Sequence, residues 1–163
     1  MSESVKPQSG KAFSVAILGA GAGGLAMAIS LQKAGIPFTI YEKAASVGGT
    51  WRDNTYPGSG CDVPSMLYSY SFEPKPDWSR KFAPQPEIVD YFEGVARKYN
   101  LLPHIRFNTE IAEAHFDEAE GLWHIRAASG EEFTANAVVS GVGQLNRPAF
   151  PKIEGLENFK GAA

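Results

Sequence analysis

The sequence predicts an α/β protein with a parallel sheet and a small antiparallel meander. The first reason is that a short apolar segment at residues 13–18 leads into a glycine-rich turn, a helical pattern and a second apolar segment at residues 37–41, which is the order of a βαβ unit. The second reason is that short strand-like segments between residues 111 and 134 are separated by Glu120-Gly121 and Ser129-Gly130, which are turn signals.

Composition and charge narrow the class of protein. With 163 residues, of which 44% are hydrophobic and 20% charged, the chain fits one globular domain. Its net charge of -3 offers no basic surface to a nucleic acid, so we expect no nucleic-acid partner. Cys61 is the single cysteine, which excludes an intrachain disulfide and cysteine-based zinc or iron-sulfur sites. It also favours a reducing compartment, and we expect the protein in the cytoplasm.

The uncharged stretch from residue 12 to residue 31 raises the question of a signal peptide or a membrane span. Four glycines lie in its middle, at positions 19, 21, 23 and 24, where each would cost a spanning helix about 1 kcal/mol of helix propensity. A strand, a turn and a helix account for the stretch better. We therefore expect no membrane segment.

The first half of the chain predicts one strand-helix-strand unit. Residues 1–11 are polar and predict a disordered lead-in, which leaves residues 12–163 as the domain. Residues 13–18 predict a strand that is buried in a parallel sheet. The helical spacing of apolar side chains from residue 23 to 34, with Gly35 at the position of a left-handed cap, predicts a helix. The second apolar segment then completes a right-handed unit.

The second half begins with a long segment, residues 44–85, that shows no clean period. A loop of this length inside a compact domain is usually functional. A second helix is predicted from Pro86, because Ile88, Phe92 and Val95 recur at helical spacing. The remaining apolar segments predict strands at residues 105–107, 111–116, 122–127, 132–134 and 137–140.

Residues 19–24, Gly-Ala-Gly-Ala-Gly-Gly, match the pattern G-x-G-x-x-G. Such glycines allow a tight turn in which backbone N–H groups and a helix N-terminus approach a pyrophosphate. The turn lies between a predicted strand and a predicted helix, and Glu42 ends the next strand, where its carboxylate can accept hydrogen bonds from both ribose hydroxyls. A glycine-rich packing turn is the simpler alternative, but the three conditions together predict a Rossmann-like dinucleotide site.

The dinucleotide of such a site is FAD or an NAD-type cofactor. Glu42 disfavours a 2′-phosphate, because two negative groups would meet without a cation between them. A second glycine pair, Gly48-Gly49, lets the backbone pass close to an extended cofactor, and it favours FAD.

The block at residues 48–62 resembles the N-terminal FAD domain of class B flavoprotein monooxygenases. Its Gly-Gly-Thr-Trp, Tyr-Pro-Gly and Cys-Asp segments are most similar to the Baeyer-Villiger branch. Many members of that branch carry an aromatic pair and Asn-Arg where this chain has Trp-Arg-Asp-Asn-Thr at residues 51–55. The resemblance covers the chain from about Ser14 onward, with further matches at residues 68–72, 85–88 and 140–145.

This resemblance implies a set of FAD contacts. They are Gly19, Gly21, Ala22 and Gly24 at the pyrophosphate, Glu42 at the ribose, backbone atoms of Ile111 at the adenine, and Gly49, Thr50, Trp51, Asp62, Tyr68 and Gln144 along the rest of the cofactor and its flavin. Asp62 is the catalytic candidate, through its charge beside the flavin and its pairing with an arginine that this sequence lacks. Trp51 and Tyr68 have a second interpretation as core aromatics, and Asp62 has one as a turn residue.

The remaining reactive side chains predict no further site. His104, His115 and His124 share no metal-ligand spacing with one another or with carboxylates, so no metal is expected. Cys61 is interpreted as a small buried hydrophobic residue rather than as a nucleophile.

The Baeyer-Villiger fingerprint, F-x-G-x-x-x-H-x-x-x-W, begins at Phe159-Lys160-Gly161, and its His and Trp are missing from the sequence, as is a second G-x-G-x-x-G for NADPH. The resemblance therefore implies an incomplete, N-terminal part of an NADPH-dependent flavin monooxygenase that is inactive alone. The full-length protein would insert oxygen beside the carbonyl of a small ketone, giving an ester or lactone. Its expected partners are that ketone, oxygen and the C-terminal portion of the protein.

Two rival hypotheses stay open. One is an amine-oxidase-like flavoprotein, although those proteins usually place an arginine after the second glycine pair, where this chain has Thr50-Trp51. The other is a non-catalytic module that binds and senses a dinucleotide, which the short chain favours.

Overall fold

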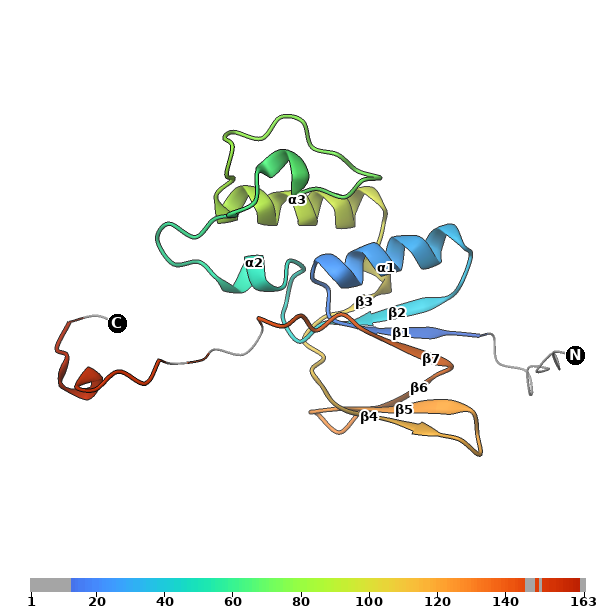
Figure 1. The fold of residues 1–163 in the computed structure, drawn as a ribbon. Coiled ribbons are helices and arrows are strands. Elements are labelled where there is room, and N and C mark those ends of the chain that lie inside the picture. The colour runs from blue at the N-terminus through green and yellow to red at the C-terminus, as the bar shows by residue number, and fades with distance from the viewer. Residues whose placement is uncertain (1–12, 146–148, 150, 162–163) are drawn as a thin grey trace, which may run out of the picture.

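The computed structural model describes residues 13–145, 149 and 151–161. They form a four-stranded parallel sheet and a three-stranded antiparallel sheet (Figure 1). The elements are β1 (Val15–Leu18), α1 (Ala22–Lys33), β2 (Phe38–Tyr41), α2 (Thr50–Asp53), α3 (Gln85–Lys98), β3 (Ile105–Arg106), β4 (Ile111–Asp117), β5 (Leu122–Ala127), β6 (Glu132–Ala135) and β7 (Ala137–Ser140). Short 3₁₀ turns lie at Ser65–Leu67, Leu102–His104 and Leu156–Asn158.

β1 lies inside the parallel sheet, whose strand order is β3-β2-β1-β7. It pairs in parallel with β2 on one side and with β7 on the other. Side chains alternate between the two faces of a strand. Val15 and Ile17 accordingly belong to the cluster beneath the helices, whereas Ala16 packs with Ile125 of the antiparallel sheet. β1 is thus buried on both faces, as its apolar sequence predicts.

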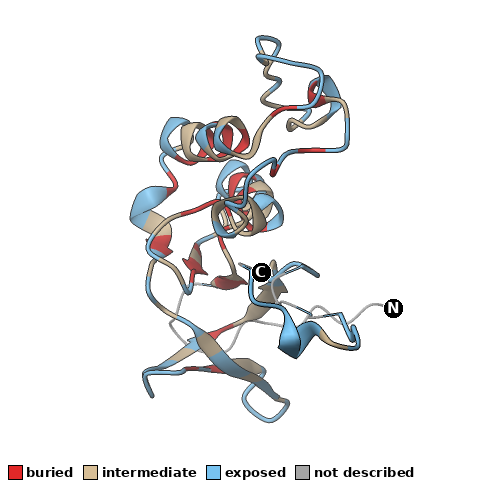
Figure 2. Cartoon of the chain, turned by 90° about the vertical axis from the view of Figure 1, so that its left-hand side faces the viewer, coloured by how far each residue is buried: buried red, intermediate tan, exposed pale blue. Residues whose placement is uncertain are grey.

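α1 and α3 lie on the side of the parallel sheet opposite the antiparallel strands (Figure 1). Ile88, Phe92 and Val95 of α3 are buried, which confirms the apolar stripe expected from their spacing. α1 buries Leu25 and Ile29 in the same cluster. Figure 2 shows the buried residues gathered around these two helices and the central strands, while exposed residues follow the outer parts of the antiparallel sheet.

The antiparallel sheet confirms the predicted meander. Its strand order is β4-β5-β6, and its pairing is interrupted by a bulge between Ile111 and Glu113 of β4. The sheet packs under the parallel sheet through a small cluster, in which the ring centroids of Tyr41 and Phe133 lie 4.7 Å apart. This contact places β6 beneath the end of β2.

The long segment at residues 44–85 contains one-turn elements that its sequence did not predict, α2 and the turn at Ser65–Leu67. Neither is long enough to show an apolar period. The segment is tied down by Ser65, which is 1% exposed. Its Oγ donates a hydrogen bond to the carbonyl oxygen of Lys81 (3.0 Å) and accepts one from the N–H of Ala83 (2.7 Å).

The other predicted boundaries differ from the structure by one or two residues. The first helix begins at Ala22 instead of residue 23, and β3 ends at Arg106, because Asn108 takes a left-handed conformation (φ 53°) that turns the chain away. The expected lead-in at residues 1–11 lies outside the described residues. Within the part of the chain that the structure describes, no helix is both long and apolar enough to cross a membrane.

Candidate dinucleotide-binding site

The glycine-rich turn connects β1 to α1, and two of its glycines lie tightly against neighbouring backbone atoms. Gly19 has φ +99°, and a Cβ there would lie 2.8 Å from the carbonyl oxygen of Gly141, which follows β7. A Cβ on Gly24 would collide with the carbonyl oxygen of Gly19. Glycine is therefore required at both positions, once for the turn conformation and once for the close approach of helix and turn.

α1 begins at Ala22, within this glycine-rich turn. Its N-cap is Gly21, which has no side chain to cap the helix, so the first backbone N–H groups are left for another acceptor. The positive end of the helix dipole lies at the same place. This arrangement suits a phosphate or pyrophosphate group.

A cleft of about 840 Å³ lies at the carboxyl ends of β1, β2 and β7, which is where open α/β sheets bind their ligands. Ten of the twelve predicted contacts line it: Gly19, Gly21, Ala22, Glu42, Gly49, Thr50, Trp51, Tyr68, Ile111 and Gln144. Gly24 does not line it, because it packs against Gly19 behind the turn. Asp62 does not line it either, and it is exposed. Burial is the main cause that raises the pKa of Tyr68, and the negative charge of Asp62 adds a smaller contribution.

Glu42 follows β2 and is 3% exposed. Its carboxylate accepts hydrogen bonds from the backbone N–H of Ala20 (2.7 Å) and of Ala44 (2.9 Å), and it forms an ion pair with Arg52 (3.0 Å). A carboxylate has about four acceptor positions, so these contacts leave about one for a ligand. Both ribose hydroxyls could be accepted only by sharing positions with these contacts, and the ribose assignment of Glu42 stays a prediction.

The expectation that no cation lies beside Glu42 is wrong, because the guanidinium of Arg52 pairs with its carboxylate. The single turn of α2 places the Arg52 side chain against the carboxylate of Glu42, which lies ten residues earlier in the chain. No sequence pattern indicated that return, because it depends on how residues 43–49 fold. The only signal was a departure from the Baeyer-Villiger pattern at this position.

Trp51 and Tyr68 line the cleft and also pack against the main core. Their interpretation as core aromatics is therefore confirmed, and their contact with a flavin stays a prediction. The Trp51 indole N–H donates to the Tyr68 hydroxyl (2.8 Å), and the two rings meet edge to face at 5.6 Å. The Gln85 side chain donates to the carbonyl oxygen of Trp51 (2.5 Å). Burial raises the pKa of Tyr68. Its hydroxyl therefore keeps its hydrogen at neutral pH.

Comparison with known proteins identifies the family. A model of the pyridine nucleotide-disulphide oxidoreductases matches residues 16–162. The chain belongs to this family. A Baeyer-Villiger monooxygenase of Pseudomonas aeruginosa is 51% identical over 162 residues, which cover 99% of this chain and 31% of that protein.

Solved structures of monooxygenases are also similar to this chain. OTEMO in complex with FAD and NADP has a TM-score of 0.83 and 33% identity, covering 94% of this chain and 30% of that one. Oxidized steroid monooxygenase bound to NADP has a TM-score of 0.81 and 38% identity, covering 90% and 29%. This oxidoreductase thus spans about a third of the length of these relatives. Its resemblance to the N-terminal part of Baeyer-Villiger monooxygenases is confirmed.

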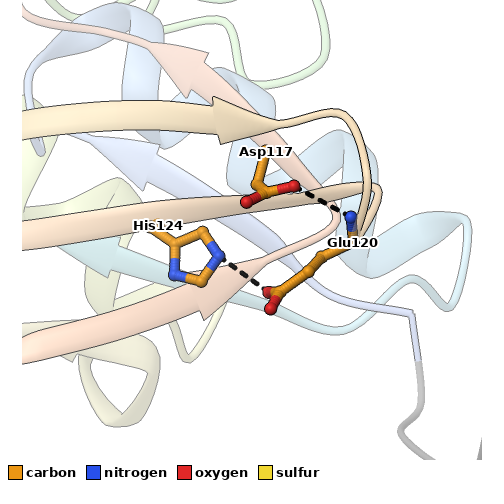
Figure 3. A group of neighbouring side chains, drawn as sticks. All are labelled: Asp117, Glu120 and His124. Carbon is orange, nitrogen blue, oxygen red and sulfur yellow. Dashed lines mark hydrogen bonds and ion pairs between the residues drawn. The ribbon is translucent and has the colours of Figure 1, made fainter.

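One cluster of possible metal ligands in this oxidoreductase was missed by its sequence pattern. Asp117, Glu120 and His124 meet at the hairpin between β4 and β5, with ligand atoms within 4.8 Å of one another (Figure 3). His124 pairs with Glu120 (2.9 Å), and Asp117 accepts from the backbone N–H groups of Ala119 and Glu120. These contacts account for the cluster as a hairpin turn, and we propose no metal there.

Cys61 does not line the cleft. It is 5% exposed and belongs to the main apolar cluster, as expected for a small buried hydrophobic residue.

Proposed function

We propose that this chain is the FAD-binding part of an NADPH-dependent Baeyer-Villiger monooxygenase. The observation that carries the proposal is that one cleft joins a glycine turn, an uncapped helix N-terminus and a buried acid to an aromatic wall. Its similarity to monooxygenases over 99% of its length supports the choice of a flavin over a nicotinamide as the resident cofactor.

The residues of the cleft fit FAD. The turn at Gly19 and the first N–H groups of α1 would receive the pyrophosphate, and the free acceptor position of Glu42 would receive a ribose hydroxyl. Trp51 and Tyr68 would lie along the flavin end and exclude water from it. When bound, FAD supplies the redox chemistry with NADPH and oxygen, while the chain supplies binding and orientation.

The activity of the whole protein requires more than these residues. We infer that a small ketone is oxidised to an ester or lactone, with NADPH and oxygen as co-substrates. A cyclohexanone monooxygenase bound to epsilon-caprolactone, 35% identical to this chain, supports this substrate class. Asp62 lies outside the cleft, so it would act there through its charge, which influences Tyr68 at the cleft, and through pairing with an arginine of the C-terminal portion. We place the protein in the cytoplasm because of its single cysteine.

The C-terminal portion of such a protein is the partner that we propose for this part. Along the described residues after β7, large apolar side chains are exposed, namely Leu145 (70%), Ile153 (58%) and Phe159 (59%). Exposed apolar residues in this number are typical of a surface that another segment covers.

The test is to load the purified chain with FAD, remove free cofactor by gel filtration, and record the visible spectrum and the rate of NADPH oxidation with a ketone present. We expect protein-bound flavin and no turnover. Binding of NAD⁺ with no binding of FAD would favour the non-catalytic nucleotide-sensing module. An FAD-loaded chain that oxidises benzylamine would favour the amine-oxidase-like alternative.

A further inference from the structure

We propose that Glu42, Arg52 and Asp53, here called the ribose triad, form a specificity device that admits a nucleotide with a free 2′-hydroxyl and rejects one with a 2′-phosphate. The inference rests on the proposed function, because it concerns the ribose end of the same cleft. It adds a role for Arg52 and Asp53, which line that cleft beside Glu42.

Arg52 bridges the two acids of the triad. Its Nη1 donates to Glu42 (3.0 Å) and to the carbonyl oxygen of Ser46 (2.6 Å). On the other side, Nε and Nη2 donate to the two carboxylate oxygens of Asp53 (2.8 and 3.1 Å). Four of the five N–H donors of the guanidinium are therefore in use.

This pairing decides what Arg52 can offer to a ligand. Two parallel N–H groups of a guanidinium are the usual means of holding a phosphate. In this chain Asp53 occupies that pair of donors, so a 2′-phosphate would have to displace a carboxylate to reach them. Arg52 can still offer its remaining N–H to a neutral hydroxyl.

The charge of the triad acts in the same direction. Two carboxylates and one guanidinium sum to one negative charge at a site where the Arg52 and Glu42 side chains are only 15% and 4% exposed. Burial works against the positive charge of Arg52, but the hydrogen bonds and charges of Asp53 and Glu42 outweigh it and raise its pKa. A 2′-phosphate would therefore meet a net negative site, where like charges repel.

We expect Asp53→Asn to keep the fold. Its side chain is 46% exposed, and an ion pair at such a position contributes little to stability. Replacing it by asparagine removes one negative charge and the bidentate ion pair that occupies two N–H groups of Arg52. Replacing Arg52 by glutamine does the opposite, because it leaves two acids without a cation. The two changes should thus move selectivity in opposite directions, which general damage to the site would not do.

The experiment is calorimetric titration of the full chain with ADP-ribose and with 2′-phospho-ADP-ribose, which differ only in the 2′-phosphate. We expect the wild type to prefer ADP-ribose, Asp53→Asn to lower this preference about tenfold, and Arg52→Gln to raise it by a similar factor. Arg52→Lys keeps the charge but loses the planar pair of donors that Asp53 occupies, so its preference should lie between those of the wild type and Asp53→Asn. Asp90→Asn, an exposed position on α3, is the matched control and should change nothing.

Each outcome has one meaning. If the wild type binds FAD and ADP-ribose but the preference is the same in Asp53→Asn and Arg52→Gln, or moves in one direction in both, the ribose triad is not a specificity device while the proposed function stands. If the wild type binds neither FAD nor ADP-ribose, both are wrong. Thermal melting of each variant without ligand shows whether it is folded.

Discussion

The hydroxyl of Tyr70 donates a hydrogen bond to the backbone carbonyl oxygen of Ala22, 48 residues earlier in the chain, at 2.5 Å. Ala22 is the first residue of α1 and lines the cleft, whereas Tyr70 belongs to the long segment between α2 and α3. The Tyr70 ring also stacks on Phe72 and meets Phe92 of α3. One side chain thus links the long segment, α3 and the turn that would receive the pyrophosphate.

Removing that hydroxyl should loosen the turn. Tyr70→Phe should lower the free energy of unfolding by about 1 kcal/mol, the usual net contribution of a hydrogen bond, and should weaken FAD binding by a few-fold. Thermal melting with and without FAD measures both effects. Tyr56→Phe is the matched control, because Tyr56 is 63% exposed. Equal effects of the two variants would show that the Tyr70 contact does not support the turn.

Two neighbouring glycines should respond in opposite ways to one added methyl group. Gly24→Ala would force a Cβ into the carbonyl oxygen of Gly19 and should cost about 3 kcal/mol or more of stability. Gly23→Ala meets nothing within 4 Å and lies inside α1, so it should stabilise the protein by about 0.5 to 1 kcal/mol. Urea unfolding without FAD measures both. A Gly24→Ala variant as stable as wild type would contradict the close approach of helix and turn.

Glu42 should be needed for FAD affinity. Glu42→Ala removes a charged acceptor whose hydrogen bonds contribute roughly 1.5 to 3 kcal/mol each, so FAD should bind about 10 to 100 times more weakly. The change also leaves Arg52 without its buried partner, so the melting temperature of the apoprotein must be recorded beside the affinity. Glu42→Gln keeps the shape and one acceptor oxygen, and it separates loss of binding from loss of fold. Unchanged FAD affinity in both variants would rule out the ribose assignment.

Alkaline pH should destabilise the fold through Tyr70. Burial, and secondarily the nearby Tyr91 and Tyr68, raise the pKa of Tyr70 above its ordinary value of 10.0. The unfolded chain therefore loses the proton first, so this contribution to stability is complete below pH 10 and declines as the pH rises further. Urea unfolding across this range should show a smaller decline for Tyr70→Phe than for wild type. Identical pH profiles would contradict the assignment.

The parts of the fold that the sequence predicted correctly depend on local signals. Apolar segments bounded by glycines marked β1 and β2, and the spacing of Ile88 and Phe92 marked α3. Glu42 could be placed at the end of β2 because the strand positions alone locate it.

The features that the sequence did not predict depend on distant contacts. α2 is one turn long and has no periodicity, so the contact between Arg52 and Glu42 could not be predicted from the sequence. Gly24 was expected at the ligand because a pattern shows that a glycine is needed but does not show which neighbour requires it. The meeting of Asp117, Glu120 and His124 depends on the hairpin geometry, which a search for linear ligand spacing does not test.

The central claim, that this cleft binds FAD with its flavin beside Trp51 and Tyr68, is tested most directly by titrating FAD with the chain and following flavin fluorescence. We expect a saturable quenching at one FAD per chain, because aromatic side chains beside a flavin quench its emission, and a smaller quenching with Trp51→Leu. Excess NAD⁺ should not reverse it. No saturable change, or full displacement by equimolar NAD⁺, would contradict the account.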